Sequence, residues 1–339
     1  MKFRKITCTV LTIVLLMSLF TGCSKKNTDT TATDKPKTTA DPNKPAKTEY
    51  NFVFIPKLVH PWYETVKAGI EQAVKEYAAQ GITVKYTWDA TATADVLAQT
   101  QKLEAAASKN PDGISIAVLD ASVNGPVIDQ LIADKIKVST FDTDAPNSQR
   151  LFYCGHADNK GDGAALAKAL AEKIGDKGEI AILSGTLSAP NHKERVEGFK
   201  EEMKKHPNVK IVAEYPDEDS LEKAISLTEN ILQSHPNLVG IFGCNASNPV
   251  GAARAVIDAG KKGKVTIVGM DDDPETIKYI KDGAIYATMV QNVKEIGYNS
   301  VKNMIALADG KTLEKKEFEV GAFMVKQDSL DNYHKVTGK

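Results

Sequence analysis

The chain has 339 residues and carries 43 Lys and Arg against 44 Asp and Glu, a formal net charge of −1. This balance offers no basic surface for nucleic acid, so nucleic acid is not an expected partner. The length exceeds one small core and favours two lobes. Four cysteines in 339 residues exclude a dense disulfide framework.

Residues 1–22 have the pattern of a bacterial export signal that ends at a cysteine. A positively charged start precedes the apolar stretch 6–20, and two small residues then lead into Cys23. The stretch is shorter than the roughly 20 residues that span a bilayer, which favours cleavage. A thiol at this junction accepts a diacylglycerol, so we expect a lipid-anchored, extracytoplasmic protein that begins at Cys23. The alternative is a plain secretory signal followed by an incidental cysteine.

Residues 23–49 combine this lipidation site with a segment of different composition. From Ser24 to Glu49 the chain has no aromatic or large aliphatic residue and is rich in Lys, Thr, Asp and Pro. Such a segment cannot bury enough apolar area to offset its chain entropy. We therefore predict a disordered tether and a folded region that begins at Tyr50.

From Tyr50 onward, short apolar runs alternate with helical patterns. The runs predict ten strands, at residues 51–56, 82–88, 114–119, 136–142, 151–155, 179–184, 209–215, 238–244, 265–271 and 284–291. Between the first two, apolar residues recur at helical spacing from Trp62 to Tyr77. This alternation predicts an α/β protein with parallel sheets covered on both faces. Cys154 and Cys244 fall in different predicted strands, so we expect no bridge between them.

Three short motifs recur further along the chain at offsets of 127 to 130 residues. The pairs are Glu64-Thr-Val66 with Glu194-Arg-Val196, Gly113-Ile114 with Gly240-Ile241, and Phe141–Asp144 with Met270–Asp273. One narrow register indicates two copies of a single α/β unit. A chance match in apolar-rich sequence is the alternative.

The repeat also locates the candidate site, because ligands of open parallel sheets bind beyond the carboxyl ends of the strands. Asp142 follows one predicted strand, Asp271 follows its counterpart and Asn245 follows a third. If the lobes face each other, these groups line one cleft. Carboxylates and amides of this kind suit the hydroxyls of a neutral sugar, which both donate and accept.

Signatures of enzymes and metal sites are missing from the sequence. There is no Gly-x-Ser-x-Gly, no His-Glu-x-x-His and no phosphate loop, and the six histidines are scattered. We therefore expect no catalysis, no cofactor and no metal; a glycosidase that uses paired carboxylates is the alternative. Asp144, Asp272 and Asp273 are expected to cap helices or turns.

The order of several motifs resembles the class I periplasmic sugar-binding proteins, the ribose- and galactose-type receptors of ABC importers. The motifs are His60–Tyr63, Val138–Asp142, Glu194–Phe199, Phe242–Asn245, Val268–Asp271 and Val290–Gln291. The resemblance extends from Tyr50 to Gln327 and implies two doubly wound parallel-sheet lobes joined by a three-segment hinge. It implies an N-terminal lobe of residues 50–157 and 292–321, and a C-terminal lobe of residues 158–291 and 322–339.

The resemblance and the residue types together give twelve candidate ligand contacts: Lys57, His60, Trp62, Tyr63, Asp142, Thr143, Asn191, Arg195, Asn245, Ala246, Asp271 and Gln291. Trp62, the more exposed of the two aromatic residues in this prediction, can cover the C–H face of a sugar. Within the family, the segments around Lys57 and Asp142 look most like the receptors for autoinducer-2, a furanosyl diol. Asn191 and Cys244 depart from that subgroup, and Thr143 departs from the ribose-type pattern. A furanosyl diol, a pentose and a hexose all stay open.

The function that the resemblance implies is a solute-binding lipoprotein of an ABC importer. It would be a monomer that captures a small neutral sugar-like ligand by hinge closure and delivers it to permease subunits. The alternative is a receptor that presents the same ligand to a membrane sensor kinase.

Overall fold

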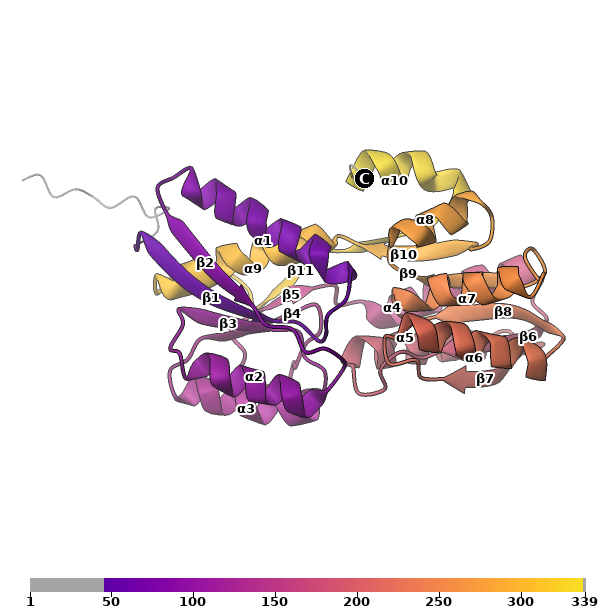
Figure 1. Ribbon diagram of the computed structural model, residues 1–339, viewed down its shortest axis with the longest axis horizontal. Coiled ribbons are helices and arrows are strands. Elements are labelled where there is room, and N and C mark those ends of the chain that lie inside the picture. Colours follow the sequence, from indigo (N-terminus) through magenta and orange to yellow (C-terminus); the bar gives the residue numbers. More distant parts are fainter. Residues whose placement is uncertain (1–45, 338–339) are drawn as a thin grey trace, which may run out of the picture. The chain divides into compact units, whose positions relative to one another are not determined.

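The computed structural model describes residues 46–337 (Figure 1). The predicted export signal, the lipid on Cys23 and most of the predicted tether lie outside these residues. The end of the tether lies inside them and differs from the prediction, because strand β1 already begins at Glu49. Lys47 forms an ion pair with Asp112, and its backbone N–H donates to the hydroxyl of Tyr50 at 3.1 Å. Ordered contacts thus begin a few residues before Tyr50.

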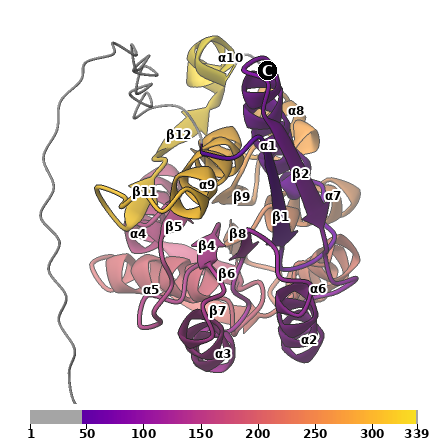
Figure 2. The ribbon, with the colours of Figure 1, turned by 90° about the vertical axis from the view of Figure 1, so that its left-hand side faces the viewer.

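The elements of the first lobe surround one six-stranded sheet. They are β1 (Glu49–Ile55), α1 (Trp62–Ala78), β2 (Thr83–Trp88), α2 (Val96–Ala107), β3 (Gly113–Ile116), α3 (Ala121–Ala133), β4 (Val138–Phe141), β5 (Tyr153–Gly155), α9 (Val293–Ala308) and β11 (Glu317–Glu319). Helices α1 and α9 cover one face of this sheet and α2 and α3 cover the other (Figure 2). The sheet is therefore buried on both faces, as its apolar strands predicted.

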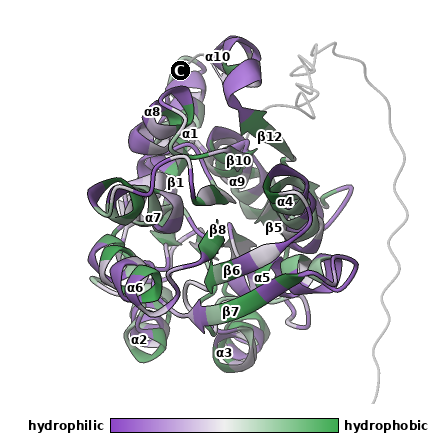
Figure 3. Ribbon diagram, turned by 90° about the vertical axis from the view of Figure 1, so that its right-hand side faces the viewer, coloured by the Kyte–Doolittle hydropathy of each residue, from purple (hydrophilic) through white to green (hydrophobic). Residues whose placement is uncertain are grey.

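The second lobe surrounds the other six-stranded sheet. Its elements are α4 (Asn159–Ile174), β6 (Gly178–Leu183), α5 (Pro190–Met203), β7 (Val209–Tyr215), α6 (Leu221–Ser234), β8 (Leu238–Gly243), α7 (Ser247–Asp258), β9 (Thr266–Met270), α8 (Pro274–Lys281), β10 (Ala287–Gln291), β12 (Ala322–Lys326), the 3-10 turn η1 (Gln327–Ser329) and α10 (Leu330–Thr337). Helix α6 carries hydrophobic and hydrophilic residues together (Figure 3) and buries Ala224, Ile231 and Leu232 in the core.

The two sheets have equivalent strand orders, β2-β1-β3-β4-β5-β11 and β7-β6-β8-β9-β10-β12. All neighbours are parallel except β10 and β12, which pair antiparallel. The predicted fold class, two doubly wound parallel-sheet lobes, is confirmed. The equivalent orders also support the interpretation of the recurring motifs as two copies of one unit.

Two edge strands, β11 and β12, were not predicted. Glu317–Glu319 is short and places a charged residue at each end, so its sequence lacks the apolar run that marks a buried strand. It adds to the edge of the first sheet through parallel pairing of Phe318 with Cys154. One predicted strand, 114–119, is shorter in the structure than in the prediction. Strand β3 ends at Ile116, and the backbone N–H of Val118 then donates to the carbonyl oxygen of Thr143 at 3.2 Å.

In each lobe, the helix that carries candidate site residues packs against a neighbouring helix with the two backbones in contact. A Cβ at Gly69 of α1 would lie 1.9 Å from the carbonyl oxygen of Lys294 in α9. A Cβ at Gly198 of α5 would lie 2.0 Å from the carbonyl oxygen of Lys160 in α4. Only glycine permits this approach, which fixes α1 and α5, the helices whose first turns carry candidate site residues.

Both lobes belong to one compact unit of the chain. The chain passes from one sheet to the other three times, between β5 and α4, between β10 and α9, and between β11 and β12. Cys154 and Cys244 are buried and unpaired, as expected. Over residues 46–337, no helix combines the length and the apolar character that a bilayer crossing requires.

Candidate ligand-binding site

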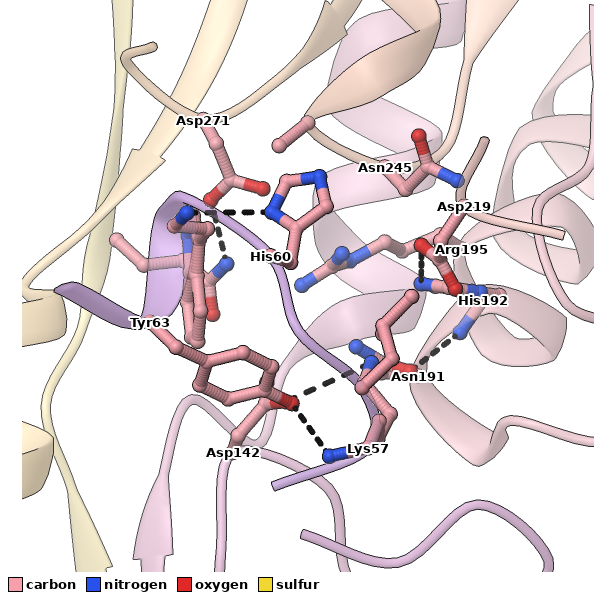
Figure 4. A pocket seen from close by; sticks show the side chains of 14 residues that line it. Lys57, His60, Tyr63, Asp142, Asn191, His192, Arg195, Asp219, Asn245 and Asp271 are labelled. Atoms are coloured by element: carbon pink, nitrogen blue, oxygen red, sulfur yellow. Dashed lines mark hydrogen bonds and ion pairs between the residues drawn. The ribbon is translucent and has the colours of Figure 1, made fainter. Parts of the chain in front are cut away.

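A cavity with about 350 Å³ of unfilled space lies between the two lobes (Figure 4). Fourteen residues line it: Lys57, Leu58, His60, Trp62, Tyr63, Asp142, Asn191, His192, Arg195, Asp219, Asn245, Ala246, Asp271 and Gln291. They come from the carboxyl ends of strands and the first turns of the helices that follow. Open parallel sheets bind ligands beyond the carboxyl ends of their strands, so the position of this cavity suits a small-molecule site.

Eleven of the twelve candidate residues line the cavity, and Thr143 does not. Thr143 is 1% exposed, and its hydroxyl donates to the carbonyl oxygen of Val118 at 2.7 Å. Its side chain therefore ties β4 to the end of β3 and is not available to a ligand. The left-handed backbone of the preceding Asp142, φ 59°, turns the chain at this point.

Three lining residues are not among the candidates from the sequence: Leu58, His192 and Asp219. Leu58 and His192 each adjoin a candidate, Lys57 and Asn191, which was the available signal. Asp219 lies between β7 and α6 in a run of acidic residues that reads as an ordinary polar loop. Only the fold brings it beside His192, with Nε2 and Oδ1 3.6 Å apart.

The first-lobe side of the cavity is built around the carboxylate of Asp142. Tyr63 donates its hydroxyl to Oδ2 at 2.6 Å, and Nζ of Lys57 lies 3.5 Å from the same oxygen. Burial, together with the nearby charge of Asp142, raises the pKa of Tyr63 well above its usual value, so the phenol stays a donor. Both described contacts use Oδ2, which leaves Oδ1 to accept a hydrogen bond from a ligand.

The second-lobe side is built around Asp271. Gln291 donates Nε2 to Oδ1 of Asp271 at 2.8 Å. Burial raises the pKa of Asp271 from 3.8 to about 6, against the opposing effects of Arg195, Gln291 and Trp62. The protein therefore holds this carboxylate ionised at neutral pH at a cost in free energy, in a position where hydroxyl donors would stabilise it.

Asp142 and Asp271 occupy the same structural position in the two lobes. Each follows its strand with a left-handed backbone, φ 59° and 66°. Each donates its backbone N–H to the next strand, Asp142 to Cys154 at 3.0 Å and Asp271 to Met289 at 2.7 Å. Non-glycine residues in this conformation are uncommon and cluster at functional sites. The duplicated turn presents both carboxylates at the strand ends.

The other three aspartates of these strand-end motifs have structural contacts. Asp273 caps α8 as predicted, accepting the N–H of Glu275 at 2.9 Å. Asp144 is not a helix cap; it forms a two-bond ion pair with Arg150. Asp272 accepts the hydroxyl of Tyr333 at 3.0 Å.

Arg195 crosses the floor of the cavity and is 2% exposed. Its Nη1 donates to the carbonyl oxygen of Cys244 at 3.2 Å, while Nε is buried without a partner among the described residues. The indole of Trp62 already interacts with the carboxylate of Asp271 and lowers its pKa, so it is not a free donor. Because an unpaired buried donor costs about 1–3 kcal/mol, Nε of Arg195 points to an acceptor that a ligand supplies.

Asn245 is held rigidly at the end of β8. Its Oδ1 accepts the N–H groups of Ser247 and Asn248 at 3.0 Å, and Nδ2 lies 3.4 Å from both carboxylate oxygens of Asp217. Burial raises the pKa of Asp217 to about 6. The amide of Asn245 therefore presents one fixed orientation to the cavity, which favours selective binding of one ligand over binding of several.

The two aromatic residues at the start of α1 form one wall. Tyr63 is 3% exposed and Trp62 is partly buried, so Trp62 is the more exposed of the two, as predicted. The rings meet edge to face, with centroids 5.1 Å apart and an interplanar angle of 85°. This packing fixes the indole at the cavity edge, where an apolar face can cover a ring.

The charges in the cavity nearly cancel. Lys57 and Arg195 face three carboxylates, those of Asp142, Asp219 and Asp271. Burial lowers the pKa of His192 to about 3, so this imidazole is neutral. Closely set donors and acceptors with little net charge match an uncharged ligand that both donates and accepts.

Comparisons with known proteins agree with this architecture. Residues 52–312 match the family described as periplasmic binding protein domain, and the chain belongs to that family. It is 32% identical over 271 residues to the D-allose-binding periplasmic protein of Escherichia coli K12, covering 77% of this chain and 84% of that protein. The predicted family resemblance is thereby confirmed.

Two solved structures are also similar. An ABC transporter solute binding protein from Burkholderia graminis, in complex with D-arabinose, is 31% identical, with a TM-score of 0.79 over 85% of this chain and 99% of that one. The glucose-galactose binding protein GanP from Geobacillus stearothermophilus is 31% identical, with a TM-score of 0.76 over 84% and 99%.

Proposed function

We propose that the protein is the substrate receptor of an ABC importer and binds one neutral monosaccharide in the interlobe cavity. The observation that carries this proposal is the pair of buried carboxylates, Asp142 and Asp271, facing each other with buried donors beside them. The named ligands of the similar proteins, D-allose, D-arabinose and glucose or galactose, support a simple sugar.

The free acceptors and donors define how such a sugar would be held. Oδ1 of Asp142 and the carboxylate of Asp271 accept from hydroxyls, and each such charge-assisted bond contributes about 1.5–3 kcal/mol. Nε of Arg195 donates to a ring or hydroxyl oxygen, and the indole of Trp62 covers the sugar from the cavity edge. A sugar that lacks a matching hydroxyl leaves one of these groups unpaired, at a cost of about 1–3 kcal/mol. Selectivity follows from that cost.

Capture requires the lobes to separate. Asp271, Asn245 and Arg195 are 4%, 3% and 2% exposed, so a ligand cannot reach them while the lobes are in contact. We place the hinge at residues 157, 291 and 321, near the three points where the chain passes from one sheet to the other. Closure then buries the polar groups only around a ligand that satisfies them.

The surroundings of this receptor are proposed from the sequence. A diacylglycerol on Cys23 would hold a monomer at the extracytoplasmic face of the membrane, with the segment before β1 as a tether. The closed lobes would dock on permease subunits. The alternative partner, a membrane sensor kinase, would use the same closed form, and pull-down of the ligand-bound protein from membranes distinguishes the two.

We propose binding without hydrolysis. The raised pKa of Asp271 is a property that a general acid also needs, so the glycosidase alternative is tested directly. Incubation with nitrophenyl glycosides of the bound sugar is expected to release no nitrophenol. Release that depends on Asp271 would establish the glycosidase alternative.

A thermal-shift screen over pentoses, hexoses and autoinducer-2, followed by calorimetry, tests the ligand class. A ligand at about 100 times its Kd stabilises the folded protein by about 2.7 kcal/mol, which a melting curve detects easily. The stabilisation should be lost in Asp142→Asn and kept in Asp258→Asn, an exposed aspartate on α7. A response to autoinducer-2 alone reassigns the ligand to that diol. No response to any of these compounds would refute the proposal.

A further inference from the structure

One hydrogen bond joins the two lobes at the edge of the cavity. Nε2 of His60, which precedes α1, lies 2.9 Å from Oγ of Ser247, the first residue of α7. His60 belongs to the first lobe and Ser247 to the second. The bond therefore exists only while the lobes are in contact, and it must break whenever they separate.

The same bond lies in a partition between two spaces. On its inner side is the ligand cavity, and on its outer side is an open groove with about 970 Å³ of unfilled space. Leu58, His60, Asp219 and Ala246 line both spaces, and Ser247 lines the groove. The partition is thus one layer of side chains thick, and His60 with Ser247 closes it.

We propose that His60 and Ser247 form a proton-sensitive gate between the outer groove and the ligand cavity. The gate deepens the proposed function and rests on it: a sugar would pass from the groove past these two side chains, and acid would hold the gate open.

The partners of the imidazole define its protonation state in the closed form. The backbone N–H of Trp62 donates to Nδ1 of His60 at 3.1 Å, so Nδ1 is an acceptor and the ring proton lies on Nε2. Nε2 then donates to Ser247, whose hydroxyl donates onward to the carbonyl oxygen of Asp219 at 3.3 Å. A second proton, on Nδ1, would leave the Trp62 N–H without its acceptor and place a charged ring in the interlobe contact, while Nε2 would still donate to Ser247.

The groups around His60 have opposing effects on its pKa, and burial has the largest effect. Burial lowers the pKa of His60, and Lys57 adds to this. The carboxylates of Asp219, Asp273 and Asp142 oppose it without reversing it. The remaining charged groups that line the two spaces beside His60 are Glu218, Glu222, Glu275, Arg195 and Asp271.

The sign of the effect follows from these shifts. In the separated lobes His60 meets water and titrates near the ordinary histidine value of about 6.5. In the closed form it binds its proton more weakly, so the open form takes up protons as the pH falls through about 6.5. Acidification therefore opens the gate, by up to about tenfold for each pH unit below 6.5.

A ligand-free experiment on the mature chain tests the gate separately from the proposed function. Imidazole NMR at pH 8 should show His60 protonated at Nε2 alone. Spin labels at Ser108→Cys and Glu229→Cys, exposed positions on opposite lobes, should report a wider distance at pH 5.5 than at pH 8. The widening should be absent in His60→Gln, which cannot titrate, and present in the matched control His235→Gln. A His60 proton on Nδ1 at pH 8, or equal widening in His60→Gln, overturns the proposal.

A kinetic experiment with D-allose and D-ribose as probes tests the hydrogen bond between His60 and Ser247. Loss of one neutral hydrogen bond in Ser247→Ala should accelerate dissociation about fivefold, while Ser122→Ala on α3 should match wild type. From pH 7.5 to 5.5, affinity should fall up to about tenfold more in wild type than in His60→Gln. Because Asp271 is present in both proteins, its own titration cancels in that comparison. If both sugars bind and Ser247→Ala dissociates at the wild-type rate, the gate is refuted. If neither binds, the proposed ligand class fails while the ligand-free result still decides the gate.

Discussion

The substitution Asp271→Asn is expected to stabilise the ligand-free protein while it removes ligand affinity. Asp271 is 4% exposed, and burial raises its pKa from 3.8 to about 6. The folded state thus binds this proton more tightly than the unfolded state does. At about 1.36 kcal/mol per pH unit, that difference means that ionised Asp271 destabilises the fold by about 3 kcal/mol above pH 6. Asparagine is neutral at every pH and still offers Gln291 an oxygen.

The pH dependence provides the sharper measurement. A raised carboxyl pKa makes wild type gain stability as the pH falls from above 6 towards 3.8, so the advantage of Asp271→Asn shrinks in the same window. Urea unfolding should show up to about 3 kcal/mol of stabilisation at pH 7.5 and about half as much at pH 5. Asp258→Asn, an exposed substitution on α7, should change little at either pH. Calorimetry should show the sugar affinity of Asp271→Asn reduced at least tenfold.

Three outcomes would contradict this prediction. A variant less stable than wild type at pH 7.5 would mean that the carboxylate of Asp271 supports the fold through Arg195 more than its burial opposes it. An equal gain at pH 5 and pH 7.5 would mean that the gain has nothing to do with ionisation. Full sugar affinity in the variant would remove Asp271 from the ligand site.

Two further substitutions test the contacts that hold the site residues in position. Tyr63→Phe removes the hydroxyl that donates to Asp142 at 2.6 Å. Calorimetry should show roughly tenfold weaker sugar binding, and circular dichroism should show an intact fold. Unchanged affinity would contradict a positioning role for Tyr63. Gly198→Ala places a Cβ 2.0 Å from a carbonyl oxygen of α4, so urea unfolding should show a loss of about 1–3 kcal/mol from overpacking. The matched change Gly125→Ala in α3, where the new Cβ meets only Ser148 Cβ at 3.9 Å, should be neutral or slightly stabilising, and equal losses in both variants would argue against the close helix contact.

The sequence was sufficient for the architecture because its signals are local. Apolar runs marked the parallel strands, and the motif at Phe141–Asp144 with its echo at Met270–Asp273 predicted a duplicated unit with a carboxylate at each strand end. Strand order and the position of Asp142 and Asp271 agree with that pattern. The short edge strand at Glu317–Glu319 escaped because its pairing is created by the neighbouring strand, and its own residues carry no signal.

The sequence predicted the site only in part, because contacts between residues far apart in the chain carry no local signal. Thr143 follows Asp142 directly and has a sugar-compatible hydroxyl, yet the left-handed turn commits that hydroxyl to Val118. In the sequence, Asp219 looks like an ordinary polar loop residue, and only the fold places it beside His192 and Lys57.

By itself the sequence determined which side chains stand at the ends of which strands, since chain direction and periodicity are properties of a few neighbouring residues. Only the tertiary structure decided which of those side chains meet, which are buried and which proton each holds. The cause is that burial and charge pairing depend on residues from both lobes. His60 and Ser247 lie 187 positions apart, and no local pattern connects them.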